Sequence, residues 1–396
     1  MATISERMRA WTGPAILSHG FRPFFLGAGL WAVLAMGGWL AMLAGALDMP
    51  TEFDPVAWHV HEFLFGYLGA VLAGFLLTAV PNWTGRLPVT GWPLGALAAL
   101  WLAGRGAVAF SALLPGGLAV ALDLAFPAVL IGLLWREITA GRNWRNLPVL
   151  GLMALFLVAN AAFHAEGGSG GLGQRGGIAV GVMLIALIGG RILPSFTRNW
   201  LAQRGASHLP TPPGRADAAV LALTAGVLVL WTGWPGAPLT AGLAGVAGLA
   251  HLWRLSRWQG HRTGAEPLVW VLHLAYAMLA LGFWAVAAAG LGWFPASAVL
   301  HVWTAGAIGL KTLAVMTRAS LGHAGLPLHA TPVIASVYLA ILLSVLLRLA
   351  AGVWPGQGWL LHGAALAWMA GFGTLAAVYW PVLTRPRAGR RSPGRA

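Results

Sequence analysis

Cysteine is absent from this sequence, and charged side chains are scarce. The 396 residues include no cysteine, only 9% charged residues and only 10 acidic ones. Without thiols the chain forms no disulfide, no thiolate-ligated haem, no cysteine-ligated iron–sulfur cluster and no cysteine-type zinc or copper site. Any metal must therefore be held by histidine, methionine, carboxylate or carbonyl groups. Because 58% of the residues are hydrophobic, the composition also excludes a soluble globular domain and indicates a membrane protein.

Long apolar runs fill most of the chain. A membrane-spanning helix needs roughly 20 mostly apolar residues, and a window of that length gives about twelve candidates. They lie near Phe24–Leu47, His59–Val80, Trp92–Leu114, Leu118–Trp135, Leu147–His164, Gly176–Pro194, Ala216–Trp234, Leu239–Trp253, Leu268–Gly290, Ala296–Thr317, Pro332–Gly352 and Gly358–Leu383. The sequence thus predicts an all-α polytopic helix bundle. Residues 1–383 are expected to form one transmembrane domain, and residues 384–396 a disordered, basic cytoplasmic tail.

The basic residues predict the orientation, because cytoplasmic loops retain arginine and lysine. With the N-terminus inside, nearly all loop arginines fall on the cytoplasmic side, and an even number of spans returns the C-terminus there. The net charge of +14 is spread over short loops and the tail instead of forming one face. This distribution of positive charge indicates that the protein interacts with the lipid bilayer and not with nucleic acid.

A short pattern recurs every four spans. The second, sixth and tenth spans end with TAVPNWTGR, ILPSFTRNW and LAVMTRASLGH, each polar and each containing threonine and arginine. This spacing predicts a pseudo-threefold arrangement of four-helix units. Because the matching stretches are short and the sixth span lacks the histidine that opens the other two, coincidence is an equal alternative.

Histidines gather at the predicted outer ends of four spans. They are His59, His61, His164, His301 and His362. A haem or metal site inside a helix bundle needs imidazoles from several helices at the same depth. Neutral imidazole can ligate a metal without bringing net charge into the bilayer. The alternative for each is an interfacial histidine that bonds a lipid headgroup or a loop carbonyl.

The stretch WHVHEFLFGY carries two of these histidines and a glutamate. At 100° per residue, His59 and His61 point about 200° apart, whereas His59 and Glu62 share one face of a regular helix. We therefore expect the two histidines to serve different sites. Glu62 is expected to hydrogen-bond a ligand imidazole or to take a proton.

Three basic residues fall inside predicted spans, where an unpaired charge is costly. Arg105 and Arg348 lie in the outer halves of their spans and are candidates to meet a haem propionate or Glu62, with snorkelling to the surface as the alternative. Lys311 lies near mid-membrane. Together with Glu62, it is the candidate group for moving protons.

A second candidate site lies at the cytoplasmic ends of the spans. The segments SHGFRPFF, GGRILPSFTRN and MTRASLGH place His19, Arg191 and His323 there. The alternative role of these segments is to end helices and to anchor them at the headgroups.

At SHGFRPFF, WHVHEFLFGYLGAVLAGFLLTAVPNWTG, GGRILPSFTRN and HVWTAGAIGLKTLAVMTRASLGH, the sequence resembles the NnrS family of multi-pass bacterial membrane proteins. The resemblance implies a helix bundle in the bacterial inner membrane, haem b, copper as a further candidate, and a part in tolerance of nitric oxide. The positions inside these motifs are His19, His59, His61, Glu62, Arg191, His301 and His323. His164 and His362 stand outside them.

A more distant architectural likeness is to the haem–copper oxidases and nitric oxide reductases. In that superfamily the second and tenth spans jointly ligate a low-spin haem, which would pair His59 or His61 with His301. The sixth and seventh spans here lack the histidines that bind the second metal of that superfamily, so the likeness covers the haem alone.

Together these observations predict a haem-containing inner-membrane protein that binds nitric oxide near the outer face and protects against nitrosative stress. Nitric oxide is uncharged and soluble in lipid, so it can reach a buried iron without a polar channel. Enzymatic reduction of nitric oxide, with an unknown electron donor, is left open. The rivals are a transporter for a metal, haem or small anion, and a sensor that holds haem without turnover.

Overall fold

The structure, a computed structural model, describes residues 11–386, and helices are the only regular secondary structure in this part of the chain. Twelve long helices follow one another. They are α2 (Phe21–Leu43), α3 (Pro55–His61) continued by η2 (Glu62–Tyr67) and α4 (Leu68–Thr84), α5 (Trp92–Ala109), α6 (Leu118–Ala140), α7 (Leu147–Ala165), α8 (Leu172–Leu184) continued by η5 (Ile185–Gly189) and α9 (Gly190–Ala202), α10 (Arg215–Gly233), α11 (Pro238–Ser256), α12 (Pro267–Gly290), α13 (Ala296–His301) continued by η7 (Val302–Gly309) and α14 (Leu310–Ala324), α15 (Pro332–Val353) and α16 (Gly358–Thr384). Short single turns, η1 (Ala15–Ser18), η3 (Ser111–Leu113), η4 (Trp144–Asn146) and η6 (Gly260–Arg262), lie between some of them. The predicted all-α class is confirmed.

Ten of the twelve helices are long and apolar enough to cross a membrane. The other two are α5 and α11. Arg105 interrupts the apolar run of α5, and His251 and Arg254 interrupt that of α11. The sequence predicted about twelve spans, and the number of helices agrees with this, although two of them are shorter and more polar than a typical span.

Local signals set the ends of several helices. Asp54 is the N-cap of α3, where its carboxylate accepts hydrogen bonds from the backbone N–H groups of Val56 and Ala57 at 2.8 and 3.0 Å. Gly85 and Gly325 end α4 and α14 in the left-handed region, at φ 70° and 75°, where a glycine is favoured.

The second, sixth and tenth long helices form the centre of the bundle. They are the most buried of the candidate spans, at 83, 72 and 72% of their most apolar windows. Each contains a π-helical segment (η2, η5 or η7), and they pack against one another through α4 with α14, and α8 with η2 and η7. These are the three helices in which the sequence pattern recurs. The pseudo-threefold relation of whole four-helix units stays a prediction.

A buried arginine stabilises the π-helical segment of the sixth helix. Arg254 of α11 donates to the carbonyl oxygen of Ala186, within η5, at 3.3 Å. The same guanidinium donates to Asp217 of α10 at 2.9 Å and to the hydroxyl of Tyr276 at 2.7 Å. A carbonyl that a π-turn displaces from regular pairing thus has a charged partner.

The polar ends of the three central helices are helical, contrary to our expectation. Pro81 and Pro194 lie inside α4 and α9. The sixth span was predicted to end at Pro194, but the helix continues to Ala202, so the connection to α10 begins at Gln203. A proline in a long helix removes one N–H donor, and neighbouring groups can satisfy the carbonyl that this frees.

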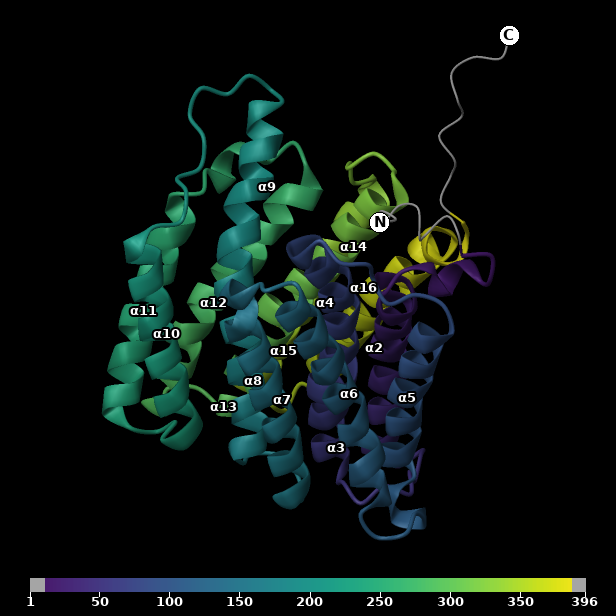
Figure 1. Cartoon of the computed structure of the whole chain (residues 1–396). Coiled ribbons are helices and arrows are strands. Elements are labelled where there is room, and N and C mark those ends of the chain that lie inside the picture. Colours follow the sequence, from purple (N-terminus) through teal and green to yellow (C-terminus); the bar gives the residue numbers. More distant parts are fainter. Residues whose placement is uncertain (1–10, 387–396) are drawn as a thin grey trace.

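Both ends of the described chain lie at the same end of the bundle, as an even number of antiparallel helices requires (Figure 1). The side chain of Arg22 in α2 donates to the carbonyl oxygens of Leu383 and Arg385 at 3.2 and 2.6 Å. We call this the predicted cytoplasmic end and the opposite one the predicted outer end. Of the predicted disordered tail, Thr384 is the last residue of α16, and residues 387–396 lie outside the described part.

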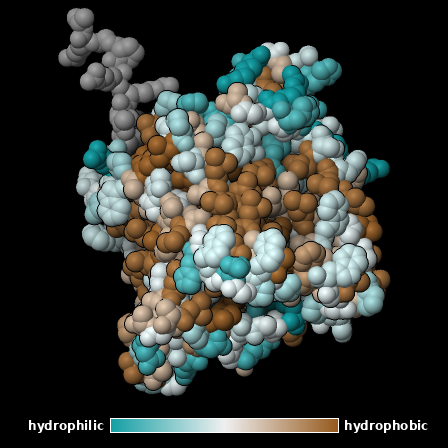
Figure 2. Space-filling model, turned by 180° about the vertical axis from the view of Figure 1, so that it is seen from behind, coloured by the Kyte–Doolittle hydropathy of each residue, from teal (hydrophilic) through white to brown (hydrophobic). Residues whose placement is uncertain are grey.

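Apolar side chains cover the middle of the molecular surface, and hydrophilic ones gather toward one end (Figure 2). Large aliphatic residues on different helices, such as Leu34 and Val229, are 63% and 67% exposed. A surface of this kind is stable in contact with lipid and not with water. The structure is therefore that of a multi-pass membrane protein.

Candidate functional site

His61 lies at the point where α3 passes into η2, and both of its ring nitrogens face oxygen atoms. Its Nδ1 is 3.0 Å from Oε1 of Glu62. Its Nε2 is 3.1 Å from Oδ2 of Asp123, on α6, and 3.1 Å from Oδ1 of Asn160, on α7. His61 and Glu62 are fully buried, and Asp123 and Asn160 are 1% and 2% exposed. Three long helices thus converge on one imidazole.

Arg105 of α5 joins the two carboxylates. Its guanidinium donates to Oε1 of Glu62 at 2.8 Å and, through its other terminal nitrogen, to Oδ1 of Asp123. The indole N–H of Trp31 donates to the remaining oxygen of Glu62 at 2.8 Å. Gly66 makes room for this arginine, because a Cβ at that position would lie 2.8 Å from the guanidinium.

His164, near the end of α7, completes the group. Its Nε2 is 3.0 Å from Oδ2 of Asp123, and its side chain is 8% exposed. One ligand atom each of His61, Asp123 and His164 lie within 4.8 Å of one another, and this is the one such metal-ligating group among residues 11–386. Two imidazoles and one carboxylate are a ligand set that suits iron, copper or zinc. We call these residues, with Glu62, Arg105 and Asn160, the His61 cluster.

The charges of the His61 cluster leave room for one more positive charge. Glu62 and Asp123 as carboxylates and Arg105 as a guanidinium sum to one negative charge. Because both nitrogens of His61 face acceptor oxygens, a neutral imidazole leaves one of these contacts without a proton. An imidazolium satisfies both contacts and neutralises the cluster. A monovalent metal ion at Nε2, with the proton on Nδ1, would do the same, and a divalent ion would leave one positive charge in excess.

His59 lies in a different environment, with aromatic neighbours. Its ring stacks on Trp39 with centroids 4.2 Å apart, and Phe63 lies 4.7 Å away. Its Nδ1 is buried and makes no hydrogen bond within the described part of the chain. His301 and Arg348 lie near enough to interact with it electrostatically. We call His59 and His301 the His59–His301 pair.

His301 is oriented by the backbone of its own helix. Its Nδ1 is 2.8 Å from the carbonyl oxygen of Ser297, an acceptor that makes Nδ1 the protonated nitrogen. The Arg348 guanidinium donates to the same oxygen at 3.3 Å. This leaves Nε2 of His301 as the nitrogen with a free lone pair, the arrangement found in histidines that ligate metals.

The structure divides the five outer histidines. His59 and His61 belong to different groups, as the helical angle predicted. The expectation that Glu62 shares a face with His59 is wrong, because the helix changes to π-helical at Glu62 and its carboxylate bonds His61. His362 is exposed and bonds only the carbonyl of Gly358 in its own helix, at 2.9 Å, so it is part of neither group.

Of the two arginines expected near Glu62 or a haem, Arg105 contacts Glu62 and Arg348 lies beside His301. Lys311 is not near Glu62. It is 5% exposed, and its Nζ donates to the carbonyl oxygen of Leu272 at 3.5 Å.

At the predicted cytoplasmic end, His19 and His323 do come together. Their ring centroids are 5.2 Å apart, and Nδ1 of His19 is 3.3 Å from the hydroxyl of Thr78. Arg191 bonds Asn146 instead, at 3.2 Å. These two imidazoles alone do not complete a metal-ligating group.

Sequence reasoning missed Asp123, Asn160 and Trp31. A signal for Asp123 was present, because it is the one acidic residue in the run LAVALDLAFP, and a carboxylate inside an apolar span marks function or pairing. Asn160 and Trp31 carried no such signal. Both residue types are common in membrane helices, and only packing shows which of them meet a charge.

Fold and site together define a polytopic helical membrane protein with two histidine-containing polar groups buried near one end. The chain matches the family model described as NnrS protein over residues 15–387, nearly its whole length. It therefore belongs to the NnrS family. No curated protein matches the chain significantly.

Proposed function

We propose that the His59–His301 pair holds a haem that binds nitric oxide, and that this binding protects the cell from nitrosative stress. The observation that carries the proposal is the buried Nδ1 of His59, which has no hydrogen-bond partner in the described chain and lies beside His301. A buried polar atom without a partner is costly, and coordination of a metal removes that cost.

The surrounding residues suit such a group. Trp39 and Phe63 provide flat apolar surface beside His59. The fixed tautomer of His301 directs its lone pair away from its own helix. Arg348 supplies a positive charge for a propionate. When bound, the haem would supply the affinity for nitric oxide that an apolar bundle lacks.

The His61 cluster supports the proposal from the other face of the same helix. The imidazole of His61 lies between the carboxylates of Glu62 and Asp123, and the same position suits a metal ion such as copper. Reduction of nitric oxide needs a proton donor and usually a second metal close to the haem. The His61 cluster could supply either one. We therefore propose that the protein binds nitric oxide, and that reduction of the bound nitric oxide is a further activity that the same site could support.

The test is the optical spectrum of the protein purified in detergent after expression with ample haem. Wild type is measured oxidised, reduced with dithionite and then exposed to nitric oxide, with iron and copper determined on the same sample. We expect a haem spectrum that shifts on addition of nitric oxide and is lost in His59→Ala and in His301→Ala. His362→Ala is the matched control, because that histidine is exposed and bonds only its own helix.

His61→Ala separates the two groups. We expect it to keep the haem spectrum, because His61 faces Asp123 and not His301. Loss of haem in His61→Ala with retention in His59→Ala would reassign the haem to the His61 cluster. A wild-type protein without haem would overturn the proposal and favour transport.

A further inference from the structure

A cavity lies where the three central helices meet, and Lys311 forms part of its wall. The cavity measures about 70 Å³ and is lined by residues of α4, α8, η5, α9, η7 and α14. Its lining is apolar except for Lys311 and Thr312. The hydroxyl of Thr312 is already occupied, because it bonds the carbonyl of Ile308 and the hydroxyl of Tyr67, both at 2.7 Å. Lys311 is therefore the lining residue whose polar group makes no hydrogen bond to another residue of the cavity wall.

Lys311 has no counter-charge among residues 11–386. No carboxylate lies within 4.0 Å of its amine, and its hydrogen bond to the carbonyl of Leu272 is long, at 3.5 Å. The residue lies ten positions beyond His301, roughly 15 Å further into the bundle at the rise of a helix. An unpaired ammonium at such depth is costly, so it must either lose its proton or gain an anion.

A glycine of the π-helical segment η5 keeps the space around the amine open. A Cβ added at Gly189 would lie 3.3 Å from Cε and 3.5 Å from Nζ of Lys311. Any larger side chain there would fill the space beside the amine. The glycine of η5 thus leaves free space beside Lys311, although the rest of the bundle centre is closely packed.

The least buried part of the cavity wall lies toward the predicted cytoplasmic end. Three of its lining residues, Phe75, Ile192 and Val315, are half-buried, and each belongs to a different central helix. The remaining lining residues are buried or lie deeper. This is the side on which the loop arginines are concentrated.

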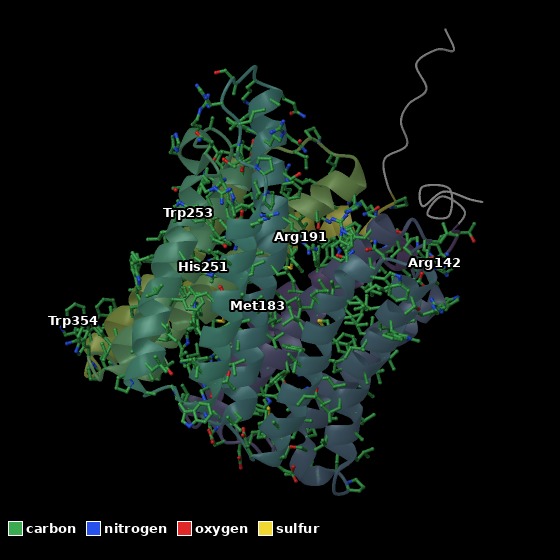
Figure 3. The ribbon with its side chains drawn as sticks, turned by 60° about the vertical axis from the view of Figure 1, so that its left-hand side comes forward. Arg142, Met183, Arg191, His251, Trp253 and Trp354 are labelled. Carbon is green, nitrogen blue, oxygen red and sulfur yellow. The ribbon has the colours of Figure 1, made fainter. Side chains whose placement is uncertain are left out.

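Two arginines lie on this side of the cavity. Arg318 follows Val315 by three positions and so shares its helix face, and its guanidinium lies 4.3 Å from the ring centre of Phe196 on α9. Arg191 is exposed on the same α9. Figure 3 shows it above Met183, on the side of the bundle toward which α9 projects. Positive charge around an apolar opening raises the local concentration of anions.

We propose that this cavity binds a small monovalent anion, held by the ammonium of Lys311 and attracted by Arg191 and Arg318. The size of the cavity limits the ligand to a few atoms, and its apolar lining favours a weakly hydrated ion over a strongly hydrated one. A divalent anion would leave one negative charge unpaired beside the single positive charge of Lys311. Burying an unpaired charge is costly, so a divalent anion is excluded.

Lys311 is the only lysine in the chain, the other basic residues being arginine, so it can be observed on its own. The experiment is ¹⁵N NMR of the full-length protein in lipid nanodiscs, labelled with lysine that carries ¹⁵N at Nζ, titrated with sodium nitrate. We expect a single ammonium resonance that moves with nitrate and saturates. Sodium sulfate at matched ionic strength should leave it in place.

Two variants test the cavity itself. Gly189→Ala keeps the lysine but narrows its surrounding, and we expect nitrate affinity to fall by about tenfold. Gly132→Ala, in α6 with nothing within 4 Å of the added Cβ, is the matched control and should bind nitrate as wild type does.

A neutral amine resonance, or an ammonium resonance that nitrate does not move, would overturn the proposal. An equal response to sulfate would also overturn it, because it would show bulk screening instead of a site. The readout is at Lys311 and requires no iron, so failure here is distinguishable from failure of the haem proposal.

Discussion

The side chains of His61 and Glu62, consecutive residues in the sequence, are hydrogen-bonded to each other, with Nδ1 and Oε1 3.0 Å apart. Consecutive side chains of a regular α-helix diverge by about 100° and do not face each other. Here the helix changes from α3 to the π-helical η2 between the two residues. Irregular turns of this kind often occur at functional sites, and this one brings a carboxylate to an imidazole that the regular geometry would have kept apart.

The first prediction concerns the buried charge pair of the His61 cluster. Arg105→Met leaves Glu62 and Asp123 without their cation, in a site where the arginine side chain is 3% exposed. We expect the free energy of unfolding to fall by about 3–5 kcal/mol, because the remaining charges are buried and unpaired. Chemical denaturation in detergent would measure it.

The control for this loss is Arg136→Met. Arg136 also pairs with a carboxylate, that of Glu137, but its side chain is 61% exposed. We expect a change below about 1 kcal/mol, because solvent screens such a pair. Equal losses in the two variants would contradict the role given to Arg105.

The second prediction concerns metal binding by the His61 cluster. Protein stripped with a chelator and titrated with Cu²⁺ or Zn²⁺ should bind one ion per chain at this site, with a rise in the thermal midpoint. Because the ion takes the place of the proton on Nε2 of His61, binding should release about one proton, measurable in a weakly buffered solution. His164→Ala should weaken binding by at least about 10–100-fold, and His362→Ala should not. Equal binding by both variants would exclude His164 as a ligand.

The third prediction is a pH dependence at the predicted cytoplasmic end. Burial, together with the nearby charges of His323 and Arg22, lowers the pKa of His19 from 6.5 to about 3. Between these two values the unfolded chain binds a proton at His19 that the folded chain does not. Stability from this group is therefore complete above pH 6.5 and falls as the pH drops toward 3, by up to about 1.4 kcal/mol per pH unit.

His19→Gln tests this dependence, because glutamine retains a polar group for Thr78 but does not titrate. Thermal midpoints of wild type and variant should lie closest together near pH 7. They should separate progressively toward pH 4, where wild type loses stability that the variant keeps. Parallel curves would show that His19 is not the source of the slope.

The fourth prediction concerns the packing that positions the helix of His301. A Cβ at Gly282 would overlap the indole of Trp303, whose N–H donates to the carbonyl of Leu279 at 3.0 Å. We expect Gly282→Ala to lower the free energy of unfolding by about 1–3 kcal/mol and to weaken haem retention. Gly226→Ala, at an exposed helical position with nothing within 4 Å, should be neutral or slightly stabilising. A neutral Gly282→Ala would mean that η7 shifts without cost.

The sequence indicated which residues of the site carry charge, but not which of them meet. His59 and His61 were correctly assigned to separate groups, because their angular separation is large in any helix. Glu62 was expected to share a face with His59, because the prediction used a regular helical period where the chain is π-helical, and its carboxylate bonds His61 instead. Asp123 was overlooked because it lies in a helix without histidines, and its partners come from α3, α5 and α7.

The amino-acid sequence by itself determined that the protein is a helical bundle with about twelve long apolar segments, because lipid requires each span to satisfy its own backbone. It also determined the chemistry available at a metal site, since the chain has no thiols. The tertiary structure decided that His61 meets Asp123, that His59 comes within electrostatic range of His301, and that Lys311 lines a cavity with no counter-charge within the described residues. These relations depend on which helices pack together and on their π-helical segments, and the hydrophobic pattern along the chain specifies neither.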